Sequence, residues 1–265
     1  MATAPLKPLG PLQDALPALT VFRRSVRIRT HGDARHGLAR VALEDDFHHF
    51  RVEVQVREGQ VRSAQGTAVR NPYSLCPSAG QQLRTLNGQP LSAVANSVTR
   101  MTDATQQCTH QLDMAGLAIA HLVRGVAQRD YTAIVPRRTE ARTQPTLLRD
   151  GEPLLQWDLL DDVLQGPAPY TGVHLREGFA KWALQHLDVD TAEAALVLRR
   201  CAMISLGRTV DLDALTSAKP WGRCYVEQPE RAPTALRVVG STWDFSTRPQ
   251  ALLADDATWL AGVQA

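Results

Sequence analysis

The sequence predicts an α+β fold in which an antiparallel sheet comes first and helices follow. Residues 21–70 alternate between apolar and polar types with the period of two that strands show. From about residue 109 the apolar positions instead recur at helical spacing, and further alternation after residue 136 predicts a second α+β half. At 265 residues, the chain can bury a large core, in one compact body or two small ones.

The strands are expected over 20–32, 37–45, 50–57 and 61–70. The clearest pattern is in the third strand, where apolar residues alternate with charged or polar ones, so that one face lies on a core and the other in water. Glu58, Gly59 and Gln60 then predict a tight reversal into the fourth strand.

A first helix is expected from Cys76 or Pro77 to Asn87, because proline favours the first turn and Gly88 can end the helix. Further helices are expected at 91–98 and from 109 onward. In the second half, Asp150 and Gly151 predict a hairpin. Helices are expected there at 175–187, at 191–206 with Asp190 or Thr191 as its cap, and at 229–240, with a strand at 222–228.

Three regions follow from this pattern. Residues 1–20 are rich in proline and predict a flexible leader without the features of a signal peptide. Residues 21–135 form an α+β domain, and residues 136–265 form a second α+β half whose hairpin strands either start a new sheet or extend the first one.

The composition argues against several kinds of partner. The 29 basic and 27 acidic residues nearly cancel, so net charge gives no attraction to nucleic acid or to an anionic membrane. No apolar run approaches the roughly 20 residues that span a bilayer. We therefore expect a cytoplasmic protein that binds a small-molecule substrate, and a homo-oligomer is compatible with the sequence.

Two of the four cysteines point to a site. Cys76 and Cys108 each stand where a loop is expected to become a helix, and His110 follows Cys108 within one turn. Backbone N–H groups and the helix dipole favour a thiolate there, which is the form that binds metals or attacks electrophiles. Cys201 lies in an apolar helix and Cys224 in an expected strand without a nearby histidine, so neither is assigned to the site.

The strand edge offers further ligands. Counting back by twos from Phe50 places His48 and Asp46 on the inward side, within the stretch EDDFHH. Sulfur and imidazole ligands together suit zinc or an iron centre, with Asp113 as a partner that orients His110. The competing interpretation is structural, with buried packing thiols and a solvated strand entrance. Tyr225, Arg237, Ser241 and Asp244 are weaker pocket candidates, and no nucleotide-binding or serine-hydrolase motif occurs.

Two family resemblances rest on these motifs. The EDDFHH cluster, the CPSA helix start, the LNG turn, the CTH helix start and the later GRCY stretch resemble the pattern of an uncharacterised bacterial family, a domain of unknown function. That resemblance suggests a role in bacterial catabolism of aromatic or polycyclic compounds. Residues 40–128 also resemble the IscU and NifU scaffold fold, which implies zinc or iron–sulfur binding, although the early cysteine is missing and the His–Cys order is reversed.

The sequence therefore predicts a metal-dependent lyase for a hydrophobic or aromatic small molecule, working by retro-aldol C–C cleavage or by dehydration. Cys76, Cys108 and His110 would hold zinc, and Asp46 or His48 would be a further ligand or the general base. Two alternatives stay open. One is a non-enzymatic zinc or iron–sulfur scaffold, and the other is a metal-free enzyme with Cys108 as nucleophile.

Overall fold

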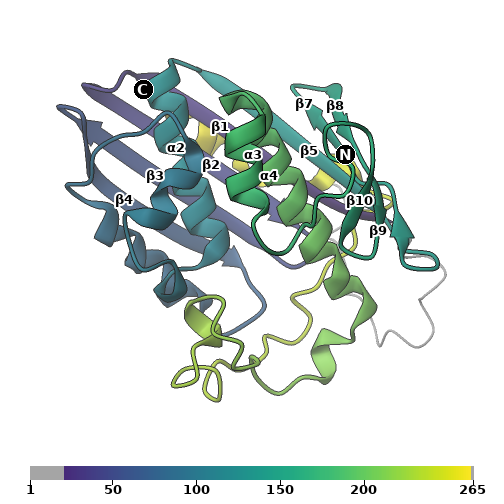
Figure 1. The fold of residues 1–265 in the computed structure, drawn as a ribbon. Coiled ribbons are helices and arrows are strands. Elements are labelled where there is room, and N and C mark those ends of the chain that lie inside the picture. Colours follow the sequence, from purple (N-terminus) through teal and green to yellow (C-terminus); the bar gives the residue numbers. More distant parts are fainter. Residues whose placement is uncertain (1–20, 264–265) are drawn as a thin grey trace, which may run out of the picture.

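The computed structural model describes residues 21–263, and its centre is an antiparallel sheet of seven strands (Figure 1). The strands lie in the order β4-β3-β2-β1-β5-β7-β8. Their bounds are β1 Val21–Gly32, β2 His36–Asp45, β3 His49–Arg57, β4 Gln60–Arg70, β5 Gln128–Pro136, β7 Thr146–Arg149 and β8 Glu152–Gln156. The predicted leader, residues 1–20, lies outside the described residues.

The four strands predicted before residue 71 and the two predicted tight turns are confirmed. Glu58 and Gly59 have φ of 53° and 79°, and Asp150 and Gly151 have φ of 54° and 93°. Two successive residues in the left-handed region match the right-handed twist of the strands that a short hairpin joins. The second hairpin brings β7 and β8 into the same sheet as β1, so the second half extends the first sheet.

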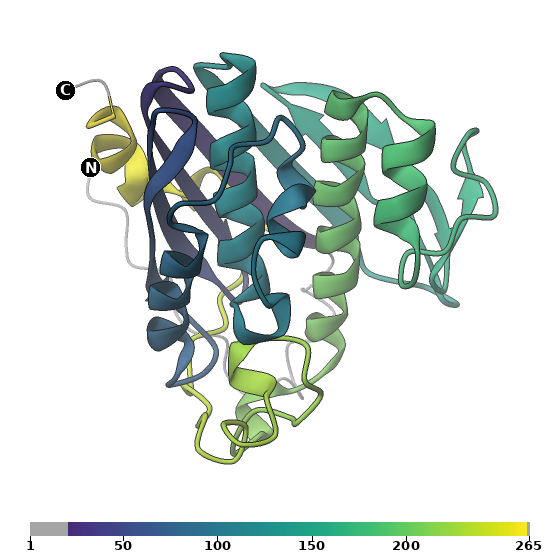
Figure 2. The ribbon, with the colours of Figure 1, turned by 60° about the vertical axis from the view of Figure 1, so that its left-hand side comes forward.

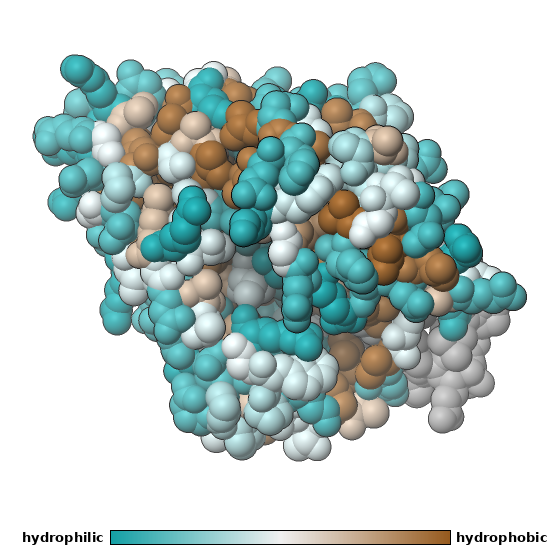
Figure 3. Space-filling view, in the orientation of Figure 1, coloured by the Kyte–Doolittle hydropathy of each residue, from teal (hydrophilic) through white to brown (hydrophobic). Residues whose placement is uncertain are grey.

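One face of the sheet is covered by the longer helices (Figures 1 and 2). These are α2 Thr109–Arg124, α3 Phe179–His186 and α4 Val189–Ile204. The short α5, Ala257–Ala261, packs on β1 and β2 from the opposite face (Figure 2). The main core lies between the sheet and the helices, and Figure 3 shows that the helix-covered face is hollowed near its middle.

The helix expected from Cys76 to Asn87 is mostly a tighter structure. Only α1, Cys76–Ala79, is α-helical, and the 3₁₀ helix η1, Gly80–Leu86, continues it. Here the chain approaches β4 very closely, since a Cβ on Gly80 would lie 2.2 Å from the backbone oxygen of Gly66. The helix expected at 91–98 is likewise the 3₁₀ helix η2, Ala95–Arg100.

Three expectations for the second half are wrong. The segment expected as a strand at 222–228 contains the 3₁₀ helix η6, Tyr225–Glu227, and residues 229–240 form turns instead of a helix. Val226 in the first segment and Ala232 and Ala235 in the second are buried against Cys76, so packing on α1 determines their path. Asp188, and not Asp190 or Thr191, caps α4.

The remaining elements are short. A second sheet has the strand order β10-β9-β6. The bounds are β6 Arg142–Thr143, β9 Asp158–Leu160, β10 Val163–Gly166, η3 Ala104–Gln106, η4 Ser205–Thr209, η5 Leu212–Ala214, η7 Pro249–Ala251 and η8 Ala254–Asp256. Within residues 21–263, no helix combines the length and the apolar character that crossing a membrane requires.

Candidate acid–base site

The EDDFHH stretch forms the hairpin between β2 and β3 instead of an open strand edge. Asp45 ends β2, and its buried carboxylate accepts hydrogen bonds from the backbone N–H groups of Phe47 (2.7 Å) and His48 (2.8 Å). An aspartate that binds the amides two and three residues ahead closes a turn without help from other segments. This side chain therefore fixes the hairpin and the backbone position of His48.

Arg24 of β1 stands directly across the sheet from Asp45. Its Nε donates to Asp45 Oδ2 at 2.8 Å, and its Nη2 donates to the same oxygen. Burial disfavours the charged carboxylate, but Arg24 and then His48 outweigh it and hold the pKa of Asp45 well below its ordinary value. Asp45 is therefore a carboxylate at neutral pH.

His48 is oriented by this carboxylate. Its Nδ1 lies 3.1 Å from Asp45 Oδ1, and because a carboxylate only accepts, Nδ1 must carry the hydrogen. Burial lowers the pKa of His48, although Asp45 partly offsets that effect. The neutral ring then has its lone pair on Nε2, the arrangement that a general base needs.

His110, in the first turn of α2, lies against His48. The two ring centroids are 4.2 Å apart and the planes are tilted by 34°. Burial, followed by the neighbouring His48, holds the pKa of His110 well below its ordinary value. Its Nε2 is buried and has no hydrogen-bond partner within the described residues. An unpaired buried nitrogen beside the dyad is costly, which favours a role in binding a ligand.

Asp46 turns away from His48 and toward the second half of the chain. Arg208 Nε donates to its Oδ2 at 3.0 Å, and the Phe245 N–H donates to its Oδ1 at 3.3 Å. Burial raises the pKa of Asp46 to about 8, outweighing the opposite effect of Arg208. The predicted pair of Asp46 and His48 is thus divided between two sides of the hairpin, and Asp45 is the carboxyl that contacts the imidazole.

The predicted thiols approach each other but are not activated. Cys76 heads α1 and Cys108 caps α2. Burial, and then the proximity of Cys108, raises the pKa of Cys76. Burial also raises the pKa of Cys108, although the N–H groups of Gln111 and His110 oppose this. Burial raises the pKa of Cys224 to about 12, and this thiol, which we did not assign to the site, also lies near Cys76. The expected thiolates are therefore thiols at neutral pH.

Within residues 21–263, no group of three or more His, Cys, Asp or Glu side chains is arranged to hold a metal ion. The donors Cys76, Cys108 and His110 do not form such a group, and zinc stays a prediction. Asp113 pairs with Arg200 at 2.8 Å. Of the weaker candidates, Asp244 pairs with Arg208 at 2.6 Å and Arg237 with Asp213 at 2.9 Å.

The comparisons with known proteins identify one region. Residues 24–123 match the family described as "Protein of unknown function (DUF2889)". The predicted resemblance to an uncharacterised family is confirmed over this DUF2889 region, which contains Arg24, the β2–β3 hairpin and His110. No curated protein matches the chain. Nothing in these comparisons supports the likeness to the IscU and NifU scaffold fold, which stays a prediction.

Asp45 and Arg24 are the site residues that sequence reasoning missed. Asp45 was passed over because parity from Phe50 assigned it to the outer face, whereas the turn buries it. One signal was available, since aspartate favours turns by accepting hydrogen bonds from the backbone about two residues ahead. Arg24 gave no signal, because only the register of β1 on β2 brings it to Asp45.

The ion pair yields a first prediction. Asp45→Asn should destabilise the protein by about 3–5 kcal/mol, because it leaves the Arg24 guanidinium buried without a counter-charge. Urea unfolding measures the change. The control is Asp130→Asn, which breaks a partly exposed pair with Arg29 and should cost less than about 1 kcal/mol. Equal effects of the two variants would contradict this account.

The imidazoles yield a second prediction. The pKa of His110 is lower in the folded protein than in the unfolded chain, where it is about 6.5. As the pH falls below about 6.5, the unfolded chain therefore binds a proton that the folded protein does not, and the contribution of His110 to stability is lost. The stability advantage of wild type over His110→Gln should therefore shrink between pH 7 and pH 5, by at most about 1.4 kcal/mol per pH unit. Asp46 has a raised pKa, so its contribution to stability changes with pH in the opposite direction. Both proteins contain Asp46, so this contribution cancels in the comparison.

Chemical unfolding of both proteins across this pH range measures the difference. The control is Gln111→Leu, which removes a buried polar neighbour on α2 that does not titrate. Its stability difference from wild type should be independent of pH. A constant difference for His110→Gln would show that the imidazole is not held neutral by the fold.

Proposed function

We propose that this protein is a lyase that acts on a hydrophobic or aromatic small molecule, with His48 as the general base. The observation that carries the proposal is the buried Asp45–His48 pair, in which Nδ1 is bound by a carboxylate and the ring is neutral. A carboxylate in that position fixes the ring and stabilises the imidazolium that forms when the base takes a proton. Asp45 is thus a positioning residue and His48 the catalytic residue.

Both predicted reactions fit this base. In a retro-aldol cleavage, His48 Nε2 would take the proton of the substrate hydroxyl, the C–C bond would break to give a carbonyl, and the imidazolium would return the proton to the carbanion. In a dehydration, His48 would remove a proton beside an activating group, and the proton would leave with the hydroxyl as water. His110 Nε2, which has no hydrogen-bond partner within the described residues, would carry a hydrogen and donate it to the oxygen of the substrate hydroxyl.

The surroundings of the base support an apolar substrate. The Phe50 ring centroid lies 5.3 Å from that of His48, and the Phe47 ring meets it edge-on at 6.2 Å. Aromatic walls of this kind stabilise a flat apolar ligand, while the two imidazoles supply the few polar groups that orient it. This proposal makes the protein a cytoplasmic catabolic enzyme for small molecules, and it requires neither nucleic acid nor membrane.

The proposal predicts a large loss of activity in His48→Gln. Wild type should release a carbonyl product or water from members of a panel of aromatic β-hydroxy carbonyl compounds and aromatic hydroxy acids. His48→Gln should reduce kcat by about 10²- to 10⁴-fold with little change in KM, because it removes proton transfer. Because burial lowers the pKa of His48, the wild-type rate should decline only below about pH 6.5.

The control is His186→Gln on α3, whose ring stacks on Trp182 away from the site. It should retain the wild-type rate. Full activity in a folded His48→Gln variant, or no turnover of any member of the panel by wild type, would reject the lyase proposal.

A zinc or iron–sulfur scaffold is the second candidate. It rests on Cys76 and Cys224, which share one buried cluster, and on Cys108, which besides burial raises the pKa of both thiols. On this proposal, purified protein contains one equivalent of zinc, or a cluster under anaerobic conditions, and loses it in Cys108→Ala. Elemental analysis measures the content, with the core variant Cys201→Ala as control. Metal-free protein that is fully folded would remove this candidate.

A further inference from the structure

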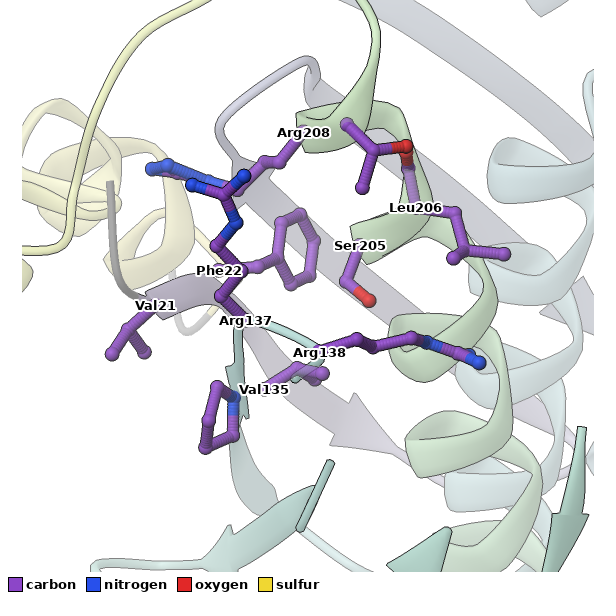
Figure 4. A pocket seen from close by; sticks show the side chains of 10 residues that line it. Val21, Phe22, Val135, Arg137, Arg138, Ser205, Leu206 and Arg208 are labelled. Carbon is purple, nitrogen blue, oxygen red and sulfur yellow. The ribbon is translucent and has the colours of Figure 1, made fainter. Parts of the chain in front are cut away.

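Arginines bind the β2–β3 turn in two different ways. Arg24 donates to the carboxylate of Asp45, and Arg208 of η4 (Figure 4) donates to the carboxylate of Asp46. Arg70, at the end of β4, instead donates to the backbone of the turn. Arg70 can therefore control the path of the chain between β2 and β3, and not only the charge of one side chain.

The terminal nitrogens of Arg70 meet the carbonyls of three turn residues. Nη1 donates to the Asp46 carbonyl at 3.0 Å, and Nη2 donates to the Asp45 carbonyl and, at 3.3 Å, to the His48 carbonyl. The side chain is only 8% exposed, so these hydrogen bonds are shielded from water. A planar guanidinium presents its donors in a fixed fork, so it holds the carbonyls in one arrangement.

This arrangement matters because the side chains of Asp45 and His48 must converge. The Asp45 backbone N–H donates to the His48 carbonyl at 2.8 Å, and Nδ1 of His48 lies 3.1 Å from Asp45 Oδ1. Both side chains leave the same short turn, so a change in its backbone angles moves the imidazole relative to the carboxylate. A misplacement of about 1 Å can lower a catalysed rate about a hundredfold.

Residues near the end of the chain hold Arg70 in place. Nη1 also donates to the Ser241 carbonyl at 2.9 Å, and the Trp243 ring centroid lies 4.4 Å from the guanidinium. Nη2 lies 3.2 Å from Glu44 Oε1, and the other oxygen of Glu44 accepts the Leu253 N–H at 2.7 Å. The position of the guanidinium, and with it the turn, therefore depends on these later segments.

Arg70 also contributes to the neutral state of His48. Burial is the main cause that lowers the pKa of His48, Asp45 opposes it, and the charges of Arg24 and Arg70 add to the lowering. A lysine in place of Arg70 would keep the charge but not the fork of hydrogen bonds. Geometry and charge can therefore be separated by experiment.

We propose that Arg70 is a positioning residue for His48, which fixes the backbone of the turn so that the imidazole stays on Asp45. The inference rests on the proposed role of His48 as the general base. Arg70 acts through the chain, since it binds the carbonyl of His48 and not its ring. Because Ser241 and Trp243 hold Arg70, the segment around residues 241–243 in turn determines the geometry of the base.

Nitrogen NMR shifts of the imidazoles and kinetics of the full chain test this role. In wild type, the signals of His48, assigned by their loss in His48→Gln, should show a hydrogen on Nδ1. In Arg70→Lys, His48 should show a mixture of both tautomers, and kcat should fall about 10- to 100-fold with KM changed less than about twofold. Arg62→Lys, at an exposed position on the same strand, should match wild type in both measurements.

Trp243→Leu keeps the test valid if Arg70→Lys fails to fold, because it removes the ring over the guanidinium and leaves the backbone N–H. It should change the tautomer in the same direction and lower kcat by at least about threefold. A folded Arg70→Lys with the wild-type tautomer and kcat would overturn the inference, as would a folded Trp243→Leu of that kind where Arg70→Lys does not fold.

Failure of the proposed function gives a different result. A hydrogen on Nε2 of His48 in wild type would reject His48 as the base, and with it the role of Arg70. If wild type turns over no member of the substrate panel, the lyase proposal fails, and the tautomer of His48 in Arg70→Lys alone decides whether Arg70 positions the ring.

Discussion

The buried ion pair between Arg24 and Asp45 is the constraint on which the rest of the site depends. Removing two charges from water costs several kcal/mol for each ion, and only good geometry with further hydrogen bonds offsets that cost. Asp45 meets this requirement, because it accepts from the Arg24 guanidinium, from two backbone amides of its own hairpin and from the His48 ring. A single carboxylate thus sets the register of β1 on β2, closes the turn and orients the base.

The second half of the chain completes this hairpin. Arg70 at the end of β4 donates to the Asp46 carbonyl at 3.0 Å and to the Ser241 carbonyl at 2.9 Å. Its guanidinium lies 4.4 Å from the centroid of the Trp243 ring. The backbone N–H of Trp243 also donates to the Asp46 carbonyl, at 2.7 Å. The match to DUF2889 ends at residue 123, so Ser241 and Trp243 lie outside the matched region, whereas Arg70 lies within it. The DUF2889 region supplies both imidazoles, whereas the later segment holds their hairpin in place.

The sheet could be predicted from the sequence because the alternation and the turn residues that specify it are local features. Alternation identified β1 to β4, and the pairs Glu58–Gly59 and Asp150–Gly151 identified the hairpins. The α1–η1 segment and residues 222–240 were predicted less well because contacts distant in sequence decide them: Gly80 against Gly66, and Val226 against Cys76. His48 and His110 were found from residue type, and the structure brings them together. The state of the thiols was not foreseen, because burial outweighs the helix dipole at Cys76 and Cys108.

Two adjacent carboxyl groups on this hairpin are held in opposite states, and the reason lies in how their arginines are shared. Arg24 directs two donors to Asp45, and the same carboxylate also binds the His48 ring. Arg208, by contrast, is divided between Asp46 and Asp244, so it offsets less of the desolvation of Asp46. Asp45 therefore keeps its charge facing the imidazoles, while burial raises the pKa of Asp46 to about 8 on the other side of the turn. One turn of chain thereby supplies an anion to a base on one side and a second carboxyl group to a shared arginine on the other.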